Sequence, residues 1–95
     1  MSAYLVFTRE KTIDQAALDT YAIEVKPALG TFGMKPLAVY GEHRVFEGPE
    51  VEGVVIMEFA TTEDATSWYQ SPAYQAACQH RFKGAEYRCV LVAGV

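Results

Sequence analysis

The segment Gly53–Tyr74 constrains the fold of this 95-residue chain more than any other part of the sequence. It begins with Val54–Phe59, a run rich in β-branched residues that is too short to span a membrane and therefore predicts a central strand. Thr61 or Thr62 can then cap a helix, because acidic residues follow at once and suit the positive end of the helix dipole. The segment thus predicts a buried strand that leads directly into a helix.

A second helix start lies inside the same helical region. Ser71 is a good N-cap, and Pro72 suits the first helical position because it lacks a backbone N–H. Apolar residues recur at helical spacing on both sides of this junction, and Gly84 ends the pattern. Glu86–Val92 then predicts the last strand.

The first half of the chain carries a similar alternation. Ala3–Thr8 predicts a strand, and Asp14 is a good N-cap for a helix with an apolar stripe. Pro27 lies inside the continuing helical pattern and predicts a kink or a break there. Lys35–Tyr40 predicts a second strand, and His43–Glu47 predicts a short ribbon strand beyond the following turn.

The resulting order, β-α-β-(β)-β-α-β, predicts a single α+β domain over residues 1–95, a ferredoxin-like β-α-β-β-α-β sandwich with helices on one face of an antiparallel sheet. Both alternating residue sets of the strands are apolar, and one helix layer cannot bury both faces of a sheet. We therefore expect a homodimer in which the open sheet faces pack together. The alternative is a monomer with an unusually large exposed apolar patch.

Charge and composition exclude several classes of partner. The formal net charge is −4 and no basic run occurs, which argues against nucleic acid and anionic membranes as partners. No window approaches the roughly 20 apolar residues of a membrane span. No signal peptide is visible and the two cysteines, Cys78 and Cys89, are expected to be reduced thiols, so a cytoplasmic location is expected.

Motifs for common cofactors are missing. The sequence has no phosphate-binding glycine loop, no nucleophile elbow, no zinc-protease helix motif and no calcium-binding loop. The cysteines and histidines do not have the spacing of metal ligands. We therefore expect neither a cofactor nor a metal.

Three runs in the second half of the chain form a specific pattern. They are a strand that ends in Glu58-Phe59, the helix start Glu63–Ala65, and Trp-Tyr-Gln-Ser-Pro-Ala-Tyr at Trp68–Tyr74, with Arg81 beyond them. This pattern resembles the family catalogued as domain of unknown function 1330, and the likeness covers essentially the whole chain. The resemblance implies a ferredoxin-like fold of the dimeric α+β barrel type. It implies no chemistry, because the function of the family is not established.

The chain departs from this family at two places. Members usually have paired glycines where this chain has Phe32-Gly33 and Tyr40-Gly41. A differently shaped hairpin is therefore expected near His43.

Glu58 and Arg81 are the sharpest candidate catalytic residues. Glu58 is a carboxylate in an apolar strand, where burying its ionised form costs free energy. Either its pKa rises so that it is neutral, or a cation pairs with it. It is either an acid/base group, or the partner of Arg81 in a structural ion pair, or a residue at the solvent end of the strand. The guanidinium of Arg81 could equally bind a substrate carboxylate.

Aromatic residues and one histidine complete the candidate site. Tyr21, Trp68 and Tyr69 lie at helical spacings that suit either a ligand pocket or the hydrophobic core. His43 adjoins a turn, where a histidine is usually a solvated surface residue. A catalytic role would require His43 to fold over the mouth of a pocket.

Three functions remain open at this point. The first is a cofactor-independent enzyme that acts on a small apolar or aromatic metabolite, monooxygenase-like or isomerase-like by fold analogy. The second is a non-catalytic small-molecule-binding or stress-associated module. The third is a structural dimeric domain whose polar residues only secure the fold.

Overall fold

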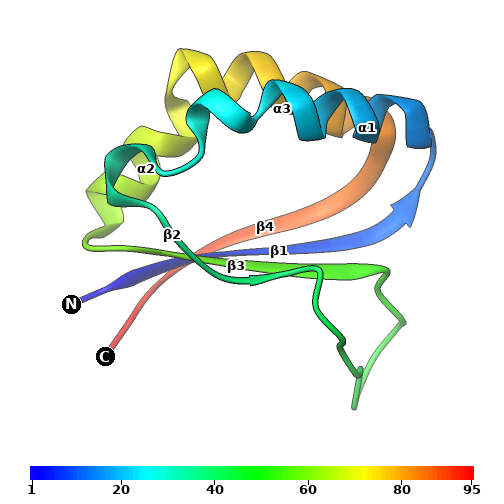
Figure 1. Cartoon of the computed structure of the whole chain (residues 1–95). Coiled ribbons are helices and arrows are strands. Elements are labelled where there is room, and N and C mark those ends of the chain that lie inside the picture. Colours follow the sequence, from blue (N-terminus) through cyan, green and yellow to red (C-terminus); the bar gives the residue numbers. More distant parts are fainter.

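The computed structural model describes residues 1–95, and its element order confirms the predicted ferredoxin-like α+β fold. The helices lie together on one face of the sheet (Figure 1). Two short 3₁₀ turns, η1 and η2, connect α1 to β2, and the second helical region is divided into α2 and α3. The bounds are β1 Ala3–Thr12, α1 Gln15–Glu24, η1 Lys26–Ala28, η2 Thr31–Gly33, β2 Lys35–Val39, β3 Gly53–Phe59, α2 Thr62–Gln70, α3 Pro72–Gly84 and β4 Ala85–Ala93.

The four strands form one antiparallel sheet in the order β2-β3-β1-β4. Leu5 of β1 lies between Met57 of β3 and Leu91 of β4. Because side chains alternate along a strand, Leu5, Phe7 and Met57 all point toward the helices, and all three are buried there. This inner face and the helices enclose the hydrophobic core.

The predicted helix starts are confirmed by their hydrogen bonds. The side chain of Asp14 accepts from the N–H groups of Ala16 and Ala17, at 3.1 and 3.4 Å. Thr61, rather than Thr62, caps α2 by accepting from the N–H of Asp64 at 3.0 Å. The predicted break near Pro27 is also present, because α1 ends at Glu24 and a 3₁₀ turn follows.

The predicted ribbon strand at His43–Glu47 is wrong for the isolated chain. No regular secondary structure occurs between the end of β2 and Gly53. Tyr40 directly follows β2 and has a φ of +53°, in the left-handed region that ends a strand. The backbone therefore turns away from the sheet at Tyr40, and the following residues meet no strand of their own chain.

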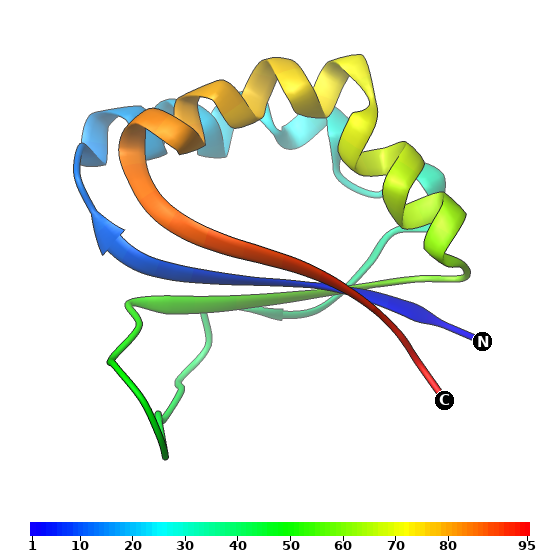
Figure 2. The same cartoon turned by 180° about the vertical axis from the view of Figure 1, so that it is seen from behind.

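The second face of the sheet is uncovered. Val90 and Val92 of β4 are exposed there, beside the half-buried Val6 and Ile56. The view from behind shows the same face free of helices (Figure 2). The predicted sheet with two apolar faces is thus present, and we call this second face the open face. None of the helices is long and apolar enough to cross a membrane.

Candidate functional site

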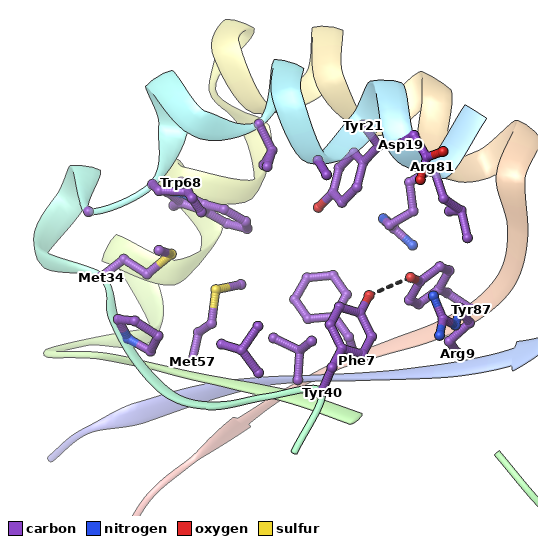
Figure 3. Close-up of a pocket in the computed structure, with 18 of the residues that line it drawn as sticks. Phe7, Arg9, Asp19, Tyr21, Met34, Tyr40, Met57, Trp68, Arg81 and Tyr87 are labelled. Atoms are coloured by element: carbon purple, nitrogen blue, oxygen red, sulfur yellow. Dashed lines mark hydrogen bonds between the residues drawn. The ribbon is translucent and has the colours of Figure 1, made fainter. Parts of the chain in front are cut away.

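A cavity of about 720 Å³ lies between the helices and the inner face of the sheet. Hydrophobic residues make up 13 of its 19 lining residues (Figure 3). Asp19 and Ala22 of α1 and Val39 of β2 line it and are exposed, which places its mouth between α1 and the edge strand β2. The volume lies within the range of about 300–1,000 Å³ that is usual for small-molecule sites.

One end of the cavity is entirely apolar, and Trp68, Met34 and Met57 lie around it (Figure 3). Trp68 is 1% exposed, and its indole Nε1 donates a hydrogen bond to the carbonyl oxygen of Ala28 at 2.8 Å. Because this N–H is already used, Trp68 offers a ligand only its ring. This end of the cavity therefore suits a hydrocarbon or aromatic group without polar atoms.

Arg81 enters the opposite end of the cavity from α3 (Figure 3). Only 3% of this residue is exposed. Its guanidinium carbon lies 5.3, 4.9 and 4.9 Å from the ring centroids of Phe7, Phe82 and Tyr87. Its neighbours are thus aromatic faces, which attract a cation but do not neutralise its charge.

No carboxylate pairs with Arg81. The only ion pair in the chain joins Nε of Arg9 to Oε1 of Glu52, at 3.5 Å. Nε of Arg81 is buried and makes no hydrogen bond. Burial lowers the pKa of Arg81, but the hydroxyls of Tyr74 and Tyr21 act against it, so the pKa is raised overall and the group stays charged. A buried cation without a counter-ion is costly, and such a group in a cavity indicates an anionic ligand.

A pair of tyrosine hydroxyls adds a donor beside Arg81. The hydroxyl oxygens of Tyr21 and Tyr74 are 3.2 Å apart. Tyr74 is completely buried, and the hydroxyl of Tyr21 is the only acceptor that its proton meets. Tyr74 must therefore donate to Tyr21, which leaves the proton of Tyr21 free to donate into the cavity. Burial raises the pKa of both phenols, so both keep their protons at neutral pH.

A second tyrosine pair lies on the sheet side of this end. The hydroxyls of Tyr40 and Tyr87 are 2.5 Å apart (Figure 3), and only one of their two protons can lie between the oxygens. To reach β4, the ring of Tyr40 crosses directly over Gly53, where an added Cβ atom would lie 2.5 Å from the ring. The guanidinium carbon of Arg9 lies 5.0 Å from the ring centroid of Tyr40. This second pair therefore also presents one free O–H donor.

The charges and hydrogen-bond donors of the cavity indicate which chemical class of ligand it can bind. Arg9 is paired with Glu52, and Asp19 is exposed and accepts from Nε2 of Gln15 at 3.0 Å. Among the residues that line the cavity, Arg81 is therefore the one buried charge without a partner, and the hydroxyls around it are donors. The polar end suits a single negative charge on acceptor oxygens, which is the chemistry of a carboxylate.

Comparison with known proteins identifies the family. The family model described as "Domain of unknown function (DUF1330)" matches residues 2–95. The chain belongs to this family. Proteins of curated function give no match to the chain.

Solved structures similar to this DUF1330 protein share its fold. A protein of unknown function from Rhodopseudomonas palustris superposes with a TM-score of 0.77 at 15% identity, over 99% of this chain and 82% of the other. A dimeric ferredoxin-like protein of unknown function from Thermobifida fusca has a TM-score of 0.67 at 9% identity, over 98% and 91%. A candidate antibiotic biosynthesis monooxygenase from Nitrosomonas europaea has a TM-score of 0.63 at 13% identity, over 99% and 89%. These identities are too low to show more than the fold.

The DUF1330 structure brings together three of the six predicted site residues. Tyr21, Trp68 and Arg81 all line the cavity. Tyr69 does not line it and packs on the ring of Tyr74, with the ring centroids 5.4 Å apart. His43 also lies outside, where its Nε2 is 2.9 Å from the carbonyl oxygen of Val51.

The expected pairing of Glu58 with Arg81 is wrong. Met57 and Phe59 point toward the helices and are buried, so Glu58 between them points to the open face. Its cross-strand neighbours are Tyr4 and Lys35. Glu58 and Arg81 therefore lie on opposite faces of the sheet, and Glu58 cannot act on a ligand bound beside Arg81.

Sequence reasoning missed five polar residues of the cavity: Arg9, Gln15, Asp19, Tyr40 and Tyr87. Arg9 and Tyr87 are cross-strand partners, in line with the inward-pointing pair Phe7 and Cys89. The alternation of β1 with β4 could therefore have placed them on the inner face. No comparable signal exists for Tyr40, because a left-handed tyrosine is uncommon.

No group of three or more histidine, cysteine or acidic residues in this chain could hold a metal ion. Cys78 and Cys89 are free thiols. Burial raises the pKa of both, so they are protonated at neutral pH and poor nucleophiles.

The buried phenols predict a loss of stability in alkali. Burial raises the pKa of Tyr74 and Tyr21 above 10.0, the ordinary value that applies in the unfolded chain. As the pH rises through 10, the unfolded chain loses these protons first, so the stabilisation that is complete below that pH declines. The free energy of unfolding is expected to fall by up to about 1.4 kcal/mol per pH unit for each such tyrosine. Urea unfolding at pH 8 and 10.5 measures this, and Tyr74→Phe should reduce the slope; an equal slope in the variant contradicts the assignment.

Proposed function

We propose that this protein binds a small organic monocarboxylate in the cavity, with the carboxylate on Arg81 and the apolar body against Trp68. The observation that carries this proposal is the buried guanidinium, which has no counter-ion and opens into a cavity with apolar walls. A bound carboxylate would supply the missing charge in a dry setting, where a charge-assisted hydrogen bond is strong.

The remaining polar groups support a ligand with one charge. A free O–H of Tyr21 on the helix side, and one from the Tyr40–Tyr87 pair on the sheet side, can donate to further lone pairs of the carboxylate. The second cation, Arg9, is already paired with Glu52. A dianion such as a phosphate monoester would therefore leave one of its charges unmatched.

A matched set of ligands tests this proposal. Phenylbutyrate, phenylbutanol and phenylbutylamine share one skeleton and carry a negative, a zero and a positive charge. Trp68 is the only tryptophan of the chain, so its fluorescence reports binding in the cavity directly. We expect the acid to bind at least about 10-fold more tightly than the alcohol, and the amine not to bind. Equal binding of acid and alcohol would contradict the proposal.

A second candidate function is turnover by a cofactor-independent enzyme that acts on a small aromatic metabolite. The free O–H of Tyr21 near Arg81 could stabilise the oxyanion of an enolate, as donors do in oxyanion holes. Asp19 is the only carboxylate that lines the cavity, which makes it the candidate base. Glu58, Tyr69 and His43 have no part in this candidate, because they lie outside the cavity.

Proton exchange in heavy water tests for turnover. An enzyme of this kind would accelerate the loss of the C3-methylene proton NMR signal of phenylpyruvate above the uncatalysed rate, and Asp19→Asn would remove the acceleration. Exchange at the uncatalysed rate, together with tight binding of phenylbutyrate, would leave binding as the function.

We also infer a homodimer formed through the open face. The exposed Val90 and Val92 support it, because an uncovered apolar face favours a second apolar face as its cover. The molecule measures 33 × 32 × 17 Å, so its broad faces exceed the roughly 800 Å² per partner of a standard interface. The Thermobifida fusca neighbour is described as dimeric, which agrees with this inference.

A charge in the open face should separate the subunits. Ile56→Lys would bury a lysine between the two sheets, so a dimer that is stable at micromolar concentration is expected to dissociate to monomers in sedimentation experiments. Ile23→Lys is the control, because Ile23 is 65% exposed on α1 away from this face. A dimeric Ile56→Lys variant would place the interface elsewhere.

We propose a cytoplasmic location as well. The two free cysteines support it, because a reducing compartment keeps such thiols from oxidation. Detection of the protein in an extracellular or periplasmic fraction would contradict this location.

A further inference from the structure

The hydrogen bond between Tyr74 and Tyr21 fixes which of the two hydroxyls donates into the cavity. Tyr74 is completely buried, and its proton meets no acceptor other than the hydroxyl oxygen of Tyr21, 3.2 Å away. The Tyr21 oxygen therefore accepts this bond, and its own proton is left for an acceptor in the cavity that Tyr21 lines. The hydroxyl of Tyr21 makes no hydrogen bond to any other group of the chain.

Aromatic contacts hold this donor in place. The ring centroid of Tyr74 lies 4.0 Å from that of Trp68 and 5.4 Å from that of Tyr69. The rings of Tyr21 and Tyr74 meet edge to face, with their centroids 6.4 Å apart and their planes at 80°. The position of the donor is thus set before a ligand binds, which lowers the entropic cost of recognition.

The hydroxyl of Tyr21 lies between the charged end and the apolar end of the cavity. The guanidinium of Arg81 lies at one end and Trp68 at the other (Figure 3). The hydroxyl of Tyr21 meets that of Tyr74, whose ring stacks on Trp68, so it lies on the Trp68 side of Arg81. A ligand whose carboxylate lies on Arg81 and whose body runs to Trp68 therefore passes this hydroxyl with the atoms that follow its carboxylate.

Other donors already surround the carboxylate itself. A carboxylate has about four acceptor sites, and the planar fork of Arg81 can donate to both of its oxygens. The Tyr40–Tyr87 pair supplies one more free O–H on the sheet side of Arg81. These groups can fill most of the acceptor sites without Tyr21. Because buried donors are seldom left without an acceptor, the Tyr21 proton indicates a further acceptor atom next to the carboxylate.

The charges around this position favour a carbonyl oxygen as that acceptor. A carbonyl oxygen only accepts hydrogen bonds, so it matches a group that donates. An ammonium group on the same carbon would face the Tyr21 proton and the charge of Arg81, and both repel it. Asp19 is the only carboxylate that lines the cavity; it is exposed and accepts from Gln15, so it offers an ammonium group no buried counter-charge.

We propose that the ligand of this cavity is a 2-oxo acid with an apolar body, whose carboxylate binds Arg81 and whose oxo oxygen accepts a hydrogen bond from Tyr21. Tyr21 then distinguishes the 2-oxo acid from a simple acid or an amino acid with the same skeleton. This inference rests on the proposed monocarboxylate site and names the class of ligand that the site takes.

Three acids with one skeleton test this inference. They are 4-phenylbutyrate, 2-oxo-4-phenylbutyrate and 2-amino-4-phenylbutyrate, which differ only at the carbon next to the carboxylate. In calorimetric titrations at neutral pH, we expect the oxo acid to bind at least about 10-fold more tightly than phenylbutyrate, and the amino acid at least about 10-fold more weakly. Equal binding of the oxo acid and phenylbutyrate would overturn the inference.

The substitution Tyr21→Phe tests the assignment of the donor. It removes only the hydroxyl, so we expect the preference for the oxo acid over phenylbutyrate to fall to within about 2-fold. Tyr69→Phe is the matched control and should keep the preference, because Tyr69 packs on the same Tyr74 ring but lies outside the cavity. A Tyr21→Phe variant that keeps the full preference would overturn the role of Tyr21.

The outcomes separate this inference from the proposed function on which it rests. If none of the three acids binds, both fail. If phenylbutyrate binds and the oxo acid binds no more tightly, the monocarboxylate site stands and the 2-oxo assignment alone fails. The preference is a ratio of two affinities measured on one variant, so a general loss of stability in Tyr21→Phe does not imitate it.

Discussion

Replacing Arg81 by methionine is expected to weaken the binding of phenylbutyrate by about 100-fold, which corresponds to about 2.7 kcal/mol, because the one uncompensated cation of the cavity is lost. The same substitution should not destabilise the protein. The desolvation of a buried ion costs several kcal/mol, and the three aromatic contacts of Arg81 return only roughly 0.5–2 kcal/mol each. Fluorescence titration and urea unfolding measure the two effects.

Arg9→Met is the matched control for this prediction. Arg9 also lines the cavity, but its charge is already paired with Glu52. We expect this variant to weaken phenylbutyrate binding by less than about 5-fold, which is below about 1 kcal/mol. If Arg81→Met instead lowered the free energy of unfolding by about 3–5 kcal/mol, Arg81 would be half of a structural pair, as in the purely structural hypothesis.

Replacing Trp68 by alanine is expected to lower the free energy of unfolding by about 3–5 kcal/mol. Its ring is almost completely buried between Phe59 and Tyr74, whose ring centroids lie 5.8 and 4.0 Å from its own. Its indole N–H also donates a hydrogen bond to the carbonyl oxygen of Ala28. For a domain of this size, the loss is a large fraction of the total stability. Thermal or urea unfolding followed by circular dichroism measures it.

Trp68→Phe separates the two parts of this effect. Phenylalanine keeps most of the ring contacts but cannot donate to Ala28, whose carbonyl oxygen still accepts from the hydroxyl of Thr31 at 2.7 Å. We therefore expect a smaller loss of about 1–3 kcal/mol, the cost of one lost hydrogen bond and a small void. A loss below about 1 kcal/mol for Trp68→Ala would mean that the ring lines the cavity but contributes little to the stability of the fold.

Local sequence signals predicted the helix starts and the strands of the molecule. Asp14 and Ser71 cap helices because their side chains reach N–H groups two or three residues ahead, a contact that depends only on local spacing. The two apolar faces of the sheet follow from strand alternation in the same way. This alternation cannot show which face the helices cover, so the sequence alone could not exclude Glu58 as a partner of Arg81.

The chemistry of the site depends on contacts that local signals do not carry. Arg81 and Tyr21 come from two helices, and Tyr40 and Tyr87 come from opposite edges of the sheet. Their meeting depends on the order of the strands and on the left-handed turn at Tyr40. Neither feature has a signature in a single sequence.

A crystal structure of the protein with phenylbutyrate would show whether Arg81 binds the carboxylate. We expect the carboxylate within hydrogen-bonding distance of the Arg81 guanidinium and the phenyl ring against Trp68, with the hydroxyl of Tyr21 donating to the ligand. A ligand bound in the reverse orientation, with its carboxylate at the mouth of the cavity and Arg81 still without an acceptor, would contradict it.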